Sequence, residues 1–366
     1  MLFDYAVVVL VLAVVATAGI TTLGKSARSP DGTVSSLASP ASPTSGQPGQ
    51  TPAGTPSTSS TNSHTPSALH TPVSGHTPSP STLPRQSPTA STQPTVTPSA
   101  PPPPASGVPN IMVIVEENNS YSAIIGNSQL PYINSLAQQY VSLTNWWGVS
   151  HPSEPNYLAM VSGSIWDNPA DLTPQDMTYP GPTLADQLAA KGIAWKAYME
   201  DMPRACDLTD QYSPGDYDVN HNPFMYFNTI RGNASQCNRD VPFTQFATDL
   251  GNGTEPPFMY VVPNLNNDMH NGTYATADNW VKSQLALVFA SNWYKQGGTV
   301  VLTWDEGESG GDQIATIVIA ERLSGHGAVA TKGNHYGLLR SLEEIYGLAY
   351  LANAASAANG DIKSLL

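Results

Sequence analysis

The chain has 366 residues, of which only 11% are charged, and Asp plus Glu outnumber Lys plus Arg by 28 to 14. A protein that binds duplex nucleic acid needs a surplus of positive charge, so the net negative charge of this chain excludes nucleic acid as a main partner. Of the 33 prolines, 18 lie between Pro30 and Pro104, which leaves residues 109–366 as the stretch with the composition of a folded domain.

The N-terminal end of the chain is predicted to direct its export. Residues 6–20 are almost wholly apolar, but they are short for a bilayer span of about 20 residues. The small residues Ala16 and Ala18 suit a signal peptidase, so residues 1–28 are predicted to be a signal peptide. The alternative is a membrane anchor, because Lys25 and Arg28 follow the apolar run. Both alternatives predict export of the rest of the chain, either secreted or anchored at the extracytoplasmic face of the membrane.

Residues 29–108 are rich in Ser, Thr and Pro and poor in aliphatic side chains. Such a segment buries too little apolar surface to offset the entropy of ordering the chain, so it is predicted to be a disordered linker. Its role would be to tether the domain at residues 109–366 at a distance from a membrane or cell wall.

Runs of apolar residues and amphipathic patterns alternate along residues 109–366. Continuous apolar runs, typical of strands covered on both faces, predict strands at 111–115, 258–262, 299–303 and 315–320. Helical patterns occupy 182–191, 277–294 and 335–346. The alternation predicts an α/β fold with a mostly parallel central sheet flanked by helices.

Residues 200–256 are rich in Pro, Asn and Asp, and are predicted to form an irregular insertion or cap. The chain's two cysteines, Cys206 and Cys237, both fall within this segment. A disulfide between them is expected to stabilise the fold by about 3 to 4 kcal/mol. The alternative is a pair of free buried thiols.

Acidic and polar side chains follow three of the predicted strands. In open α/β sheets, ligands bind beyond the carboxyl ends of the strands, so these side chains are expected to meet at one edge. The first strand is followed by Glu117 and Asn118, the second by Asp268 and the third by Asp305 and Glu306.

Carboxylate and amide oxygens are the ligands that hard divalent cations prefer. We therefore expect Glu117, Asn118, Asp305 and Glu306 to hold one divalent cation, with Asp268 as a further candidate ligand. The donor set favours Mg²⁺, Ca²⁺ or Mn²⁺ over Zn²⁺ without resolving the identity of the metal.

Ser153 precedes a helical pattern at 156–162 and is the candidate nucleophile. A hydroxyl in the first turn of a helix can attack phosphorus while the helix dipole stabilises the added negative charge. A nearby metal would lower the pKa of that hydroxyl. The structural alternative is that Ser153 only caps the helix.

Two histidines accompany the acids. His270 and His335 are candidates for a general acid and a phosphate donor, or for ligands of a second, softer metal together with Asp268. His221 is interpreted as part of a loop and not as a catalytic residue.

Seven segments together carry a family resemblance. They are VIVEENNSYSAIIG (113–126), HPSEPNYLAMVSG (151–163), WKAYMEDMP (195–203), HNPFMYF (221–227), VPNLNNDMH (262–270), TWDEGE (303–308) and HYGLLRSLEEIYGL (335–348). In this order they resemble the bacterial phosphoesterase family, which groups secreted acid phosphatases with phospholipases C within the alkaline phosphatase superfamily.

The resemblance implies an alkaline-phosphatase-like fold, Ser153 as the nucleophile and His270 and His335 as active-site histidines. It also assigns Glu117, Asn118, Asp305 and Glu306 to metal-ligand positions. Glu306 stands where a zinc-binding histidine would follow in the two-zinc members of the superfamily, so a single metal is preferred.

The predicted function is an exported phosphatase that hydrolyses phosphate monoesters through a serine nucleophile and a bound divalent metal. Its partner would be a small phosphorylated substrate or a phospholipid or phosphoinositide head group. The alternatives are a phospholipase C or other phosphodiesterase and, from a different class, a non-catalytic module of the cell surface.

Overall fold

The computed structural model describes residues 107–166, 172–209, 216–308 and 313–366. The predicted signal or anchor at 1–28 and nearly all of the linker at 29–108 lie outside the described residues. Within these ranges, no helix has the length and apolar character needed to cross a bilayer.

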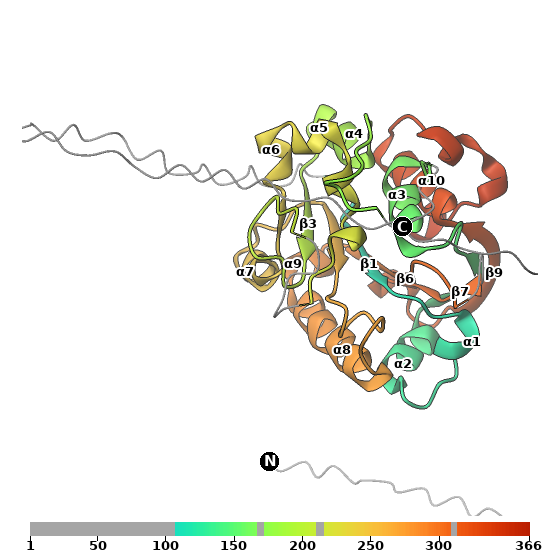
Figure 1. Ribbon diagram of the computed structural model, residues 1–366. Coiled ribbons are helices and arrows are strands. Elements are labelled where there is room, and N and C mark those ends of the chain that lie inside the picture. The colour runs from blue at the N-terminus through green and yellow to red at the C-terminus, as the bar shows by residue number, and fades with distance from the viewer. Residues whose placement is uncertain (1–106, 167–171, 210–215, 309–312) are drawn as a thin grey trace, which may run out of the picture. The chain divides into compact units, whose positions relative to one another are not determined.

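A nine-stranded sheet forms the centre of the described part (Figure 1). Its strands are β1 (Ile111–Glu116), β2 (Val141–Trp147), β3 (Trp195–Met199), β4 (Asp240–Pro242), β5 (Phe258–Val262), β6 (Thr299–Trp304), β7 (Gln313–Ile314), β8 (Thr316–Ile319) and β9 (Gly327–Asn334). Their order across the sheet is β4-β3-β5-β1-β6-β8-β2-β7, and β9 pairs with β2. Five of these pairings are parallel and three are antiparallel.

The prediction of a mostly parallel sheet is confirmed, and the three antiparallel pairings all involve β7 or β8. The strand β8 runs antiparallel to both of its neighbours, β6 and β2. Parallel neighbours need a crossover of about a dozen or more residues, which usually contains a helix. Only residues 305–315 connect β6 with β8. The chain therefore turns back and lays β8 antiparallel to β6.

The four predicted strands are present because their apolar runs fill the interior. All residues of β1, β5, β6 and β8 are buried. The run predicted at 315–320 forms β8, and the two residues of β7 precede it.

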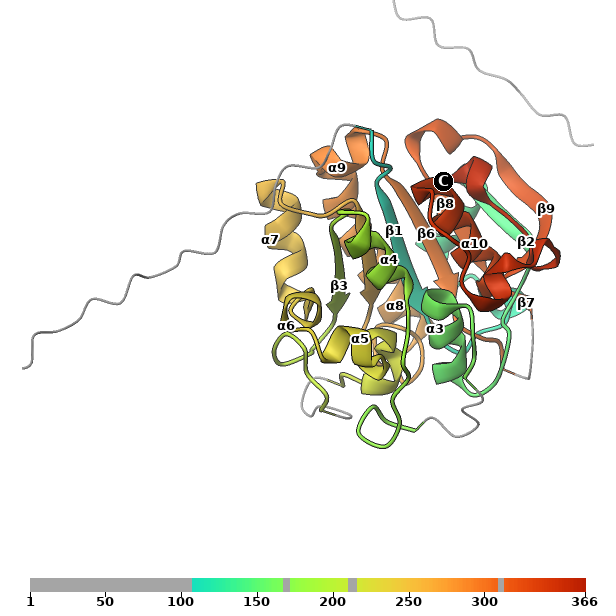
Figure 2. The same cartoon turned by 90° about the horizontal axis from the view of Figure 1, so that it is seen from above.

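Helices cover both faces of this sheet. On one face lie α3 (Ser153–Ser162), α4 (Leu184–Ala190) and α10 (His335–Tyr346), as Figures 1 and 2 show. On the other lie α2 (Pro131–Gln139) and α8 (Tyr274–Ala290), which contact each other. The short helix α1 (Tyr121–Ile124) follows β1.

The single helix expected at 277–294 is divided in two. The first part, α8, ends at Ala290, and α9 (Asn292–Lys295) follows it. Between them Ser291 has extended backbone angles, and its side chain accepts a hydrogen bond from the N–H of Tyr294. A serine in this position caps a new helix instead of continuing the old one.

The prediction that residues 200–256 form an irregular cap is wrong in one respect. The segment supplies the edge strand β4 and the helices α5 (Asn228–Arg231), α6 (Ala234–Cys237) and α7 (Thr244–Asn252). It also carries two short 3₁₀ helices, η1 (Val219–His221) and η2 (Pro223–Tyr226). Because Phe224, Tyr226 and Phe227 are fully buried, the segment belongs to the hydrophobic core. The disulfide between Cys206 and Cys237 is confirmed.

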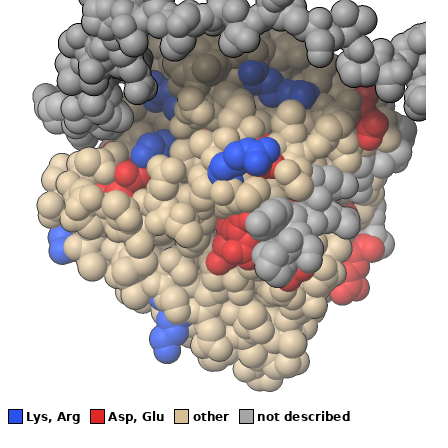
Figure 3. Space-filling view, turned by 60° about the vertical axis from the view of Figure 1, so that its left-hand side comes forward, with Lys and Arg blue, Asp and Glu red and all other residues tan. Residues whose placement is uncertain are grey.

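The face drawn in Figure 3 is mostly uncharged, with Lys and Arg in small groups apart from most of the Asp and Glu side chains. This pattern agrees with a chain of which only 11% is charged.

The carboxyl of Asp240, on the edge strand β4, makes the stability of the fold depend on pH. Burial raises its pKa from an ordinary 3.8 to about 8, and a hydrogen bond from Asn222 Nδ2 at 2.7 Å opposes this shift in part. The fold thus favours the protonated form, whereas the unfolded chain ionises near pH 3.8. The contribution of this group is therefore fully present below about pH 4 and is lost as the pH rises to about 8.

We expect Asp240→Asn to remove a slope of up to about 1.4 kcal/mol per pH unit from the free energy of unfolding. Urea titrations of the wild type and the variant at pH 5 and pH 7 measure it. Equal slopes in the two proteins would contradict the buried, protonated state of Asp240.

Candidate active site

Three strand ends meet at one edge of the sheet, as the sequence predicts. The N–H of Asp305, just after β6, donates to the carbonyl of Glu116 at 3.0 Å. The N–H of Glu117 donates to the carbonyl of Asp268 at 2.8 Å. These backbone bonds bring the carboxylates of Glu117, Asp268 and Asp305 to the same place.

Ser153 is the first residue of α3, and its side chain is turned toward this cluster. Its Oγ lies 3.0 Å from Glu117 Oε2 and 3.3 Å from Asn118 Oδ1. The residue is 6% exposed. The start of a helix carries a partial positive charge and free N–H groups, which favour an anion beside Ser153.

Asn118 joins the two strand ends in a backbone conformation that few residues adopt. Its φ is 49°, in the left-handed region, where asparagine is tolerated better than most other side chains. Its N–H donates to Asp305 Oδ1 at 3.0 Å. A residue in this conformation persists where its surroundings hold it. Here the side-chain oxygen of Asn118 accepts from Ser153 while its backbone N–H donates to Asp305.

The three carboxylates form a buried cluster of like charge. Glu117, Asp268 and Asp305 are each 0% exposed. Burial raises the pKa of all three, and the charge of Asp305 raises the pKa of Glu117 further. Glu117 Oε1 and Asp268 Oδ2 face only a histidine, His221, whereas Asp305 Oδ2 has no hydrogen-bond partner among the described residues. A cluster of buried carboxylates without a Lys or Arg partner has the chemistry of a site for a hard cation.

This chemistry fits a divalent metal, although the described side chains do not form a closed cage. No group of three His, Cys, Asp or Glu is arranged to hold a metal ion in the described ranges. Glu306, a predicted ligand, is held by the protein through both oxygens. Its Oε1 lies 3.1 Å from His151 Nδ1, and its Oε2 accepts from Asn156 Nδ2 at 3.1 Å.

These contacts make Glu306 a support for the loop before Ser153. Asn156 Oδ1 also accepts from the N–H groups of Val149 and Ser150, at 2.9 and 3.1 Å. Glu306 and Asn156 together therefore fix the segment from which the nucleophile candidate begins.

His221 is the residue that the sequence analysis missed. Its Nε2 lies 3.3 Å from Glu117 Oε1 and its Nδ1 lies 3.6 Å from Asp268 Oδ2. Burial lowers the pKa of His221, but the charge of Glu117 and the hydrogen bond with Asp268 outweigh it and raise that pKa well above 6.5. Tyr157 of α3 stacks on the imidazole, with ring centroids 5.2 Å apart. The available signal was its place in the HNPF segment of the family resemblance.

The two predicted histidines differ in position. His270 is exposed. Its backbone N–H donates to Asp268 Oδ1 at 2.8 Å, and its ring centroid lies 5.8 Å from that of His221. His335 is fully buried at the start of α10, and its Nε2 is hydrogen-bonded to the carbonyl oxygen of Asp305. Burial lowers the pKa of His335 to about 4, so its imidazole is neutral near neutral pH.

Comparison with known proteins adds to this geometry. A model of the Phosphoesterase family matches residues 126–349. A phosphatidylinositol-3-phosphatase of Mycobacterium tuberculosis is 34% identical over 69% of this chain and 83% of the relative. A probable acid phosphatase of Kluyveromyces lactis is 31% identical over 68% of this chain, which spans only 60% of the yeast protein. Among solved structures, an alkaline phosphatase superfamily protein from Vibrio parahaemolyticus has a TM-score of 0.46 at 13% identity, covering 72% of this chain and 76% of that chain.

Proposed function

The chain belongs to the Phosphoesterase family, and on this premise we propose that it is an exported phosphatase that cleaves phosphate monoesters through Ser153. The family match and the relatives named acid phosphatases support a phosphoric monoester hydrolase. One observation carries the assignment of the nucleophile. The Ser153 hydroxyl starts a helix and lies against the Glu117 carboxylate in a cluster of buried acids.

In the proposed reaction, Ser153 Oγ attacks phosphorus in line with the leaving oxygen. Its proton passes to Glu117 Oε2, which lies 3.0 Å away. The ester P–O bond breaks, and the leaving oxygen takes a proton from His270, the exposed histidine at the rim of the cluster. Water then hydrolyses the phosphoserine, which releases phosphate and restores the serine hydroxyl.

Glu117, Asn118, Asp305 and Glu306 are proposed to hold one divalent cation, with Asp268 as a further ligand. When bound, the cation would lower the pKa of the serine hydroxyl and offset the negative charge of the phosphate. The three buried carboxylates of Glu117, Asp268 and Asp305, which meet at one edge of the sheet, support this assignment. Ca²⁺, Mg²⁺, Mn²⁺ and Zn²⁺ remain alternatives.

The other histidines have positioning roles in this proposal. Neutral His335 holds the Asp305 backbone in place through its Nε2 hydrogen bond. His221, between Glu117 and Asp268, orients both carboxylates and supplies positive charge beside them.

The substrate is proposed to be a small phosphorylated molecule or a phosphoinositide head group, in line with the name of the mycobacterial relative. Export through residues 1–28, and a tether to membrane or cell wall through residues 29–108, complete the proposal. They rest on the apolar N-terminal run and the composition of the linker.

Removing the metal from the full chain tests the cation. We expect chelation to abolish nitrophenyl phosphate hydrolysis, and one of Ca²⁺, Mg²⁺ or Mn²⁺, added singly, to restore it. Restoration by Zn²⁺ alone would favour a site that contains histidine. Activity that survives exhaustive chelation, with no metal found in the protein by elemental analysis, would contradict a metal-dependent mechanism. A bis-nitrophenyl diester assayed in parallel would reveal a phosphodiesterase.

A further inference from the structure

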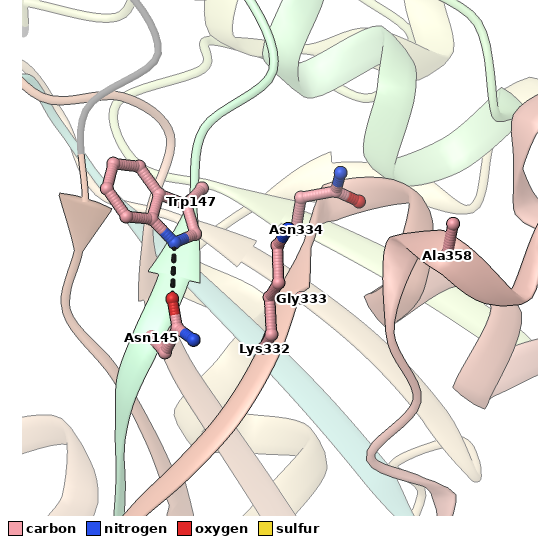
Figure 4. A pocket seen from close by; sticks show the side chains of 6 residues that line it. All are labelled: Asn145, Trp147, Lys332, Gly333, Asn334 and Ala358. Carbon is pink, nitrogen blue, oxygen red and sulfur yellow. Dashed lines mark hydrogen bonds between the residues drawn. The ribbon is translucent and has the colours of Figure 1, made fainter.

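A pocket of about 460 Å³ lies between β2, β9 and the C-terminal segment (Figure 4). Its lining residues are Asn145, Trp147, Lys332, Gly333, Asn334 and Ala358. The volume falls within the range of about 300–1,000 Å³ typical of small-molecule sites. None of these residues has a role in the phosphoryl transfer proposed above.

The pocket is joined to the catalytic edge by both of its strands. Trp147 and Asn334 face each other in the register of β2 and β9. Gly148 follows Trp147, and a Cβ placed on it would lie 3.2 Å from the Asp305 carbonyl oxygen. His335 follows Asn334 and is hydrogen-bonded to the same oxygen. The pocket therefore flanks Asp305.

Trp147 supplies an aromatic surface at the wall of the pocket. It is 36% exposed, and it is one of three large hydrophobic side chains that are exposed in the described ranges. Its Nε1–H donates to Asn145 Oδ1 at 2.8 Å, which fixes the orientation of the indole, as the dashed line in Figure 4 shows. A solvent-exposed indole held in one orientation is suited to stacking against the flat C–H face of a ring.

Lys332 supplies a positive charge at the same pocket. Its side chain is exposed, and within the described ranges it has neither an ion pair nor a hydrogen bond. Residues 109–366 contain 11 Lys and Arg against 26 Asp and Glu, because three basic and two acidic residues of the chain's 14 and 28 precede them. An unpaired lysine in such an acidic domain is a local attractor for an anion, which it binds as a point charge.

The floor of the pocket requires a glycine. A Cβ on Gly333 would lie 2.0 Å from Cζ3 of Trp146, a fully buried ring beneath it. Asn334 is fixed on either side, since its Oδ1 accepts from the Gly337 N–H at 3.2 Å and its Nδ2 donates to Asn359 Oδ1 at 3.1 Å. The shape of the pocket is thus fixed by packing and hydrogen bonds.

We propose that this pocket binds the leaving group of the substrate, and that the preferred leaving group is a hydroxylated ring with a second anionic substituent. Trp147 would stack on the ring, Lys332 would pair with the second anion, and the amide of Asn145 would contact a hydroxyl. This inference rests on the proposed monoesterase function, because it concerns the part of the same substrate that is not transferred. Binding energy from such a part increases the rate as well as the affinity.

Steady-state kinetics of the full chain on matched substrates test the pocket. Two ring bisphosphates are used: glucose 1,6-bisphosphate, whose ring is a sugar, and inositol 1,4-bisphosphate, whose ring is a cyclitol. Comparing them shows which kind of ring is preferred. Glucose 6-phosphate carries a ring without a second anion, and glycerol 2-phosphate carries neither. We expect Trp147→Ala to lower kcat/KM about tenfold for all ring substrates and to leave glycerol 2-phosphate within about twofold. Lys332→Ala should lower it about tenfold for the bisphosphates alone, and Lys332→Arg should retain most of it.

Lys282→Ala is the matched control, because Lys282 is an exposed lysine on α8, on the other face of the sheet. It should leave every substrate unchanged. An equal loss on glycerol 2-phosphate in the Trp147 or Lys332 variants would overturn the proposal, because it would indicate a general structural role. Unchanged kinetics on the ring substrates would overturn it as well.

Calorimetric titration separates this inference from the proposed function. The Ser153→Ala protein should bind the ring bisphosphates, and the further changes Trp147→Ala and Lys332→Ala should weaken that binding about tenfold each. If the wild type hydrolysed no monoester while this pattern of binding held, the proposed function would fail and the pocket would stand. If hydrolysis were normal but the ring bisphosphates bound the Trp147 and Lys332 variants equally well, only the pocket would be rejected.

Discussion

Ser153→Ala is expected to lower kcat for monoester hydrolysis by about 10⁴-fold or more, because it removes the atom that forms the bond to phosphorus. The side chain is small, and its hydroxyl contacts Glu117 and Asn118. The free energy of unfolding should therefore fall by no more than about 1 to 3 kcal/mol, the cost of one buried hydrogen bond to a carboxylate, and the variant should still fold. Phosphate release and urea titration measure the two quantities on the same preparation.

Ser162→Ala is the control on the same helix, since its hydroxyl donates to the carbonyl of Leu158 at 2.8 Å, at the far end of α3. It should cost about 1 kcal/mol of stability and leave kcat unchanged. The assignment of the nucleophile is rejected if Ser153→Ala keeps a tenth of wild-type turnover. It gains independent support if acid quenching during turnover traps phosphate on a peptide that contains Ser153.

Glu117→Gln is expected to lower kcat/KM by about 10³-fold. The change keeps the size of the side chain but removes the carboxyl group that faces Ser153 at 3.0 Å and His221 at 3.3 Å. It removes at once the proposed proton acceptor and one ligand of the proposed cation, and each such group contributes about 10²-fold or more. Activity is measured with each added metal at saturating concentration.

The neighbouring Glu116→Gln supplies a control that differs by one position. Glu116 is also fully buried, but it makes no described hydrogen bond or ion pair with Ser153 or His221. Burial, reinforced by the charges of Asp268 and Glu200, raises the pKa of Glu116 well above 4.5, so an amide resembles its protonated form. We expect this variant to retain activity within about threefold. A loss as large as that of Glu117→Gln would mean that the effect comes from general disruption of the strand end.

The strands that form the buried centre of the sheet could be predicted because their apolar runs are continuous. β9 could not be predicted in this way. Its positions alternate between half-buried and exposed, and Gly333 alone among them is buried, so the stretch lacks the continuous apolar run that marks the central strands. It pairs with β2 through the backbone, and that pairing depends on a distant part of the chain.

Some residues of the candidate site could likewise be predicted from the sequence, and others could not. Glu117, Asp268 and Asp305 could be predicted together because the carboxyl ends of parallel neighbours share an edge. His221 could not, because it comes from the loop-rich segment before β4 and reaches the acids only through the fold. The contacts of the Glu306 oxygens with His151 and Asn156 could not be predicted either, because they are made only in the folded protein.

The position of β2 in the sheet also has a consequence for the order in which the protein can fold. Its partners β7, β8 and β9 all come from residues 313–334, long after β2 in the chain. During synthesis, β2 therefore emerges well before any strand that can pair with it, and pairing of such distant segments is slow. A chain that ended before residue 313 would leave the buried face and both edges of β2 unsatisfied. We therefore expect nascent or truncated chains to depend on a chaperone, or to aggregate, until residues 313–334 are made.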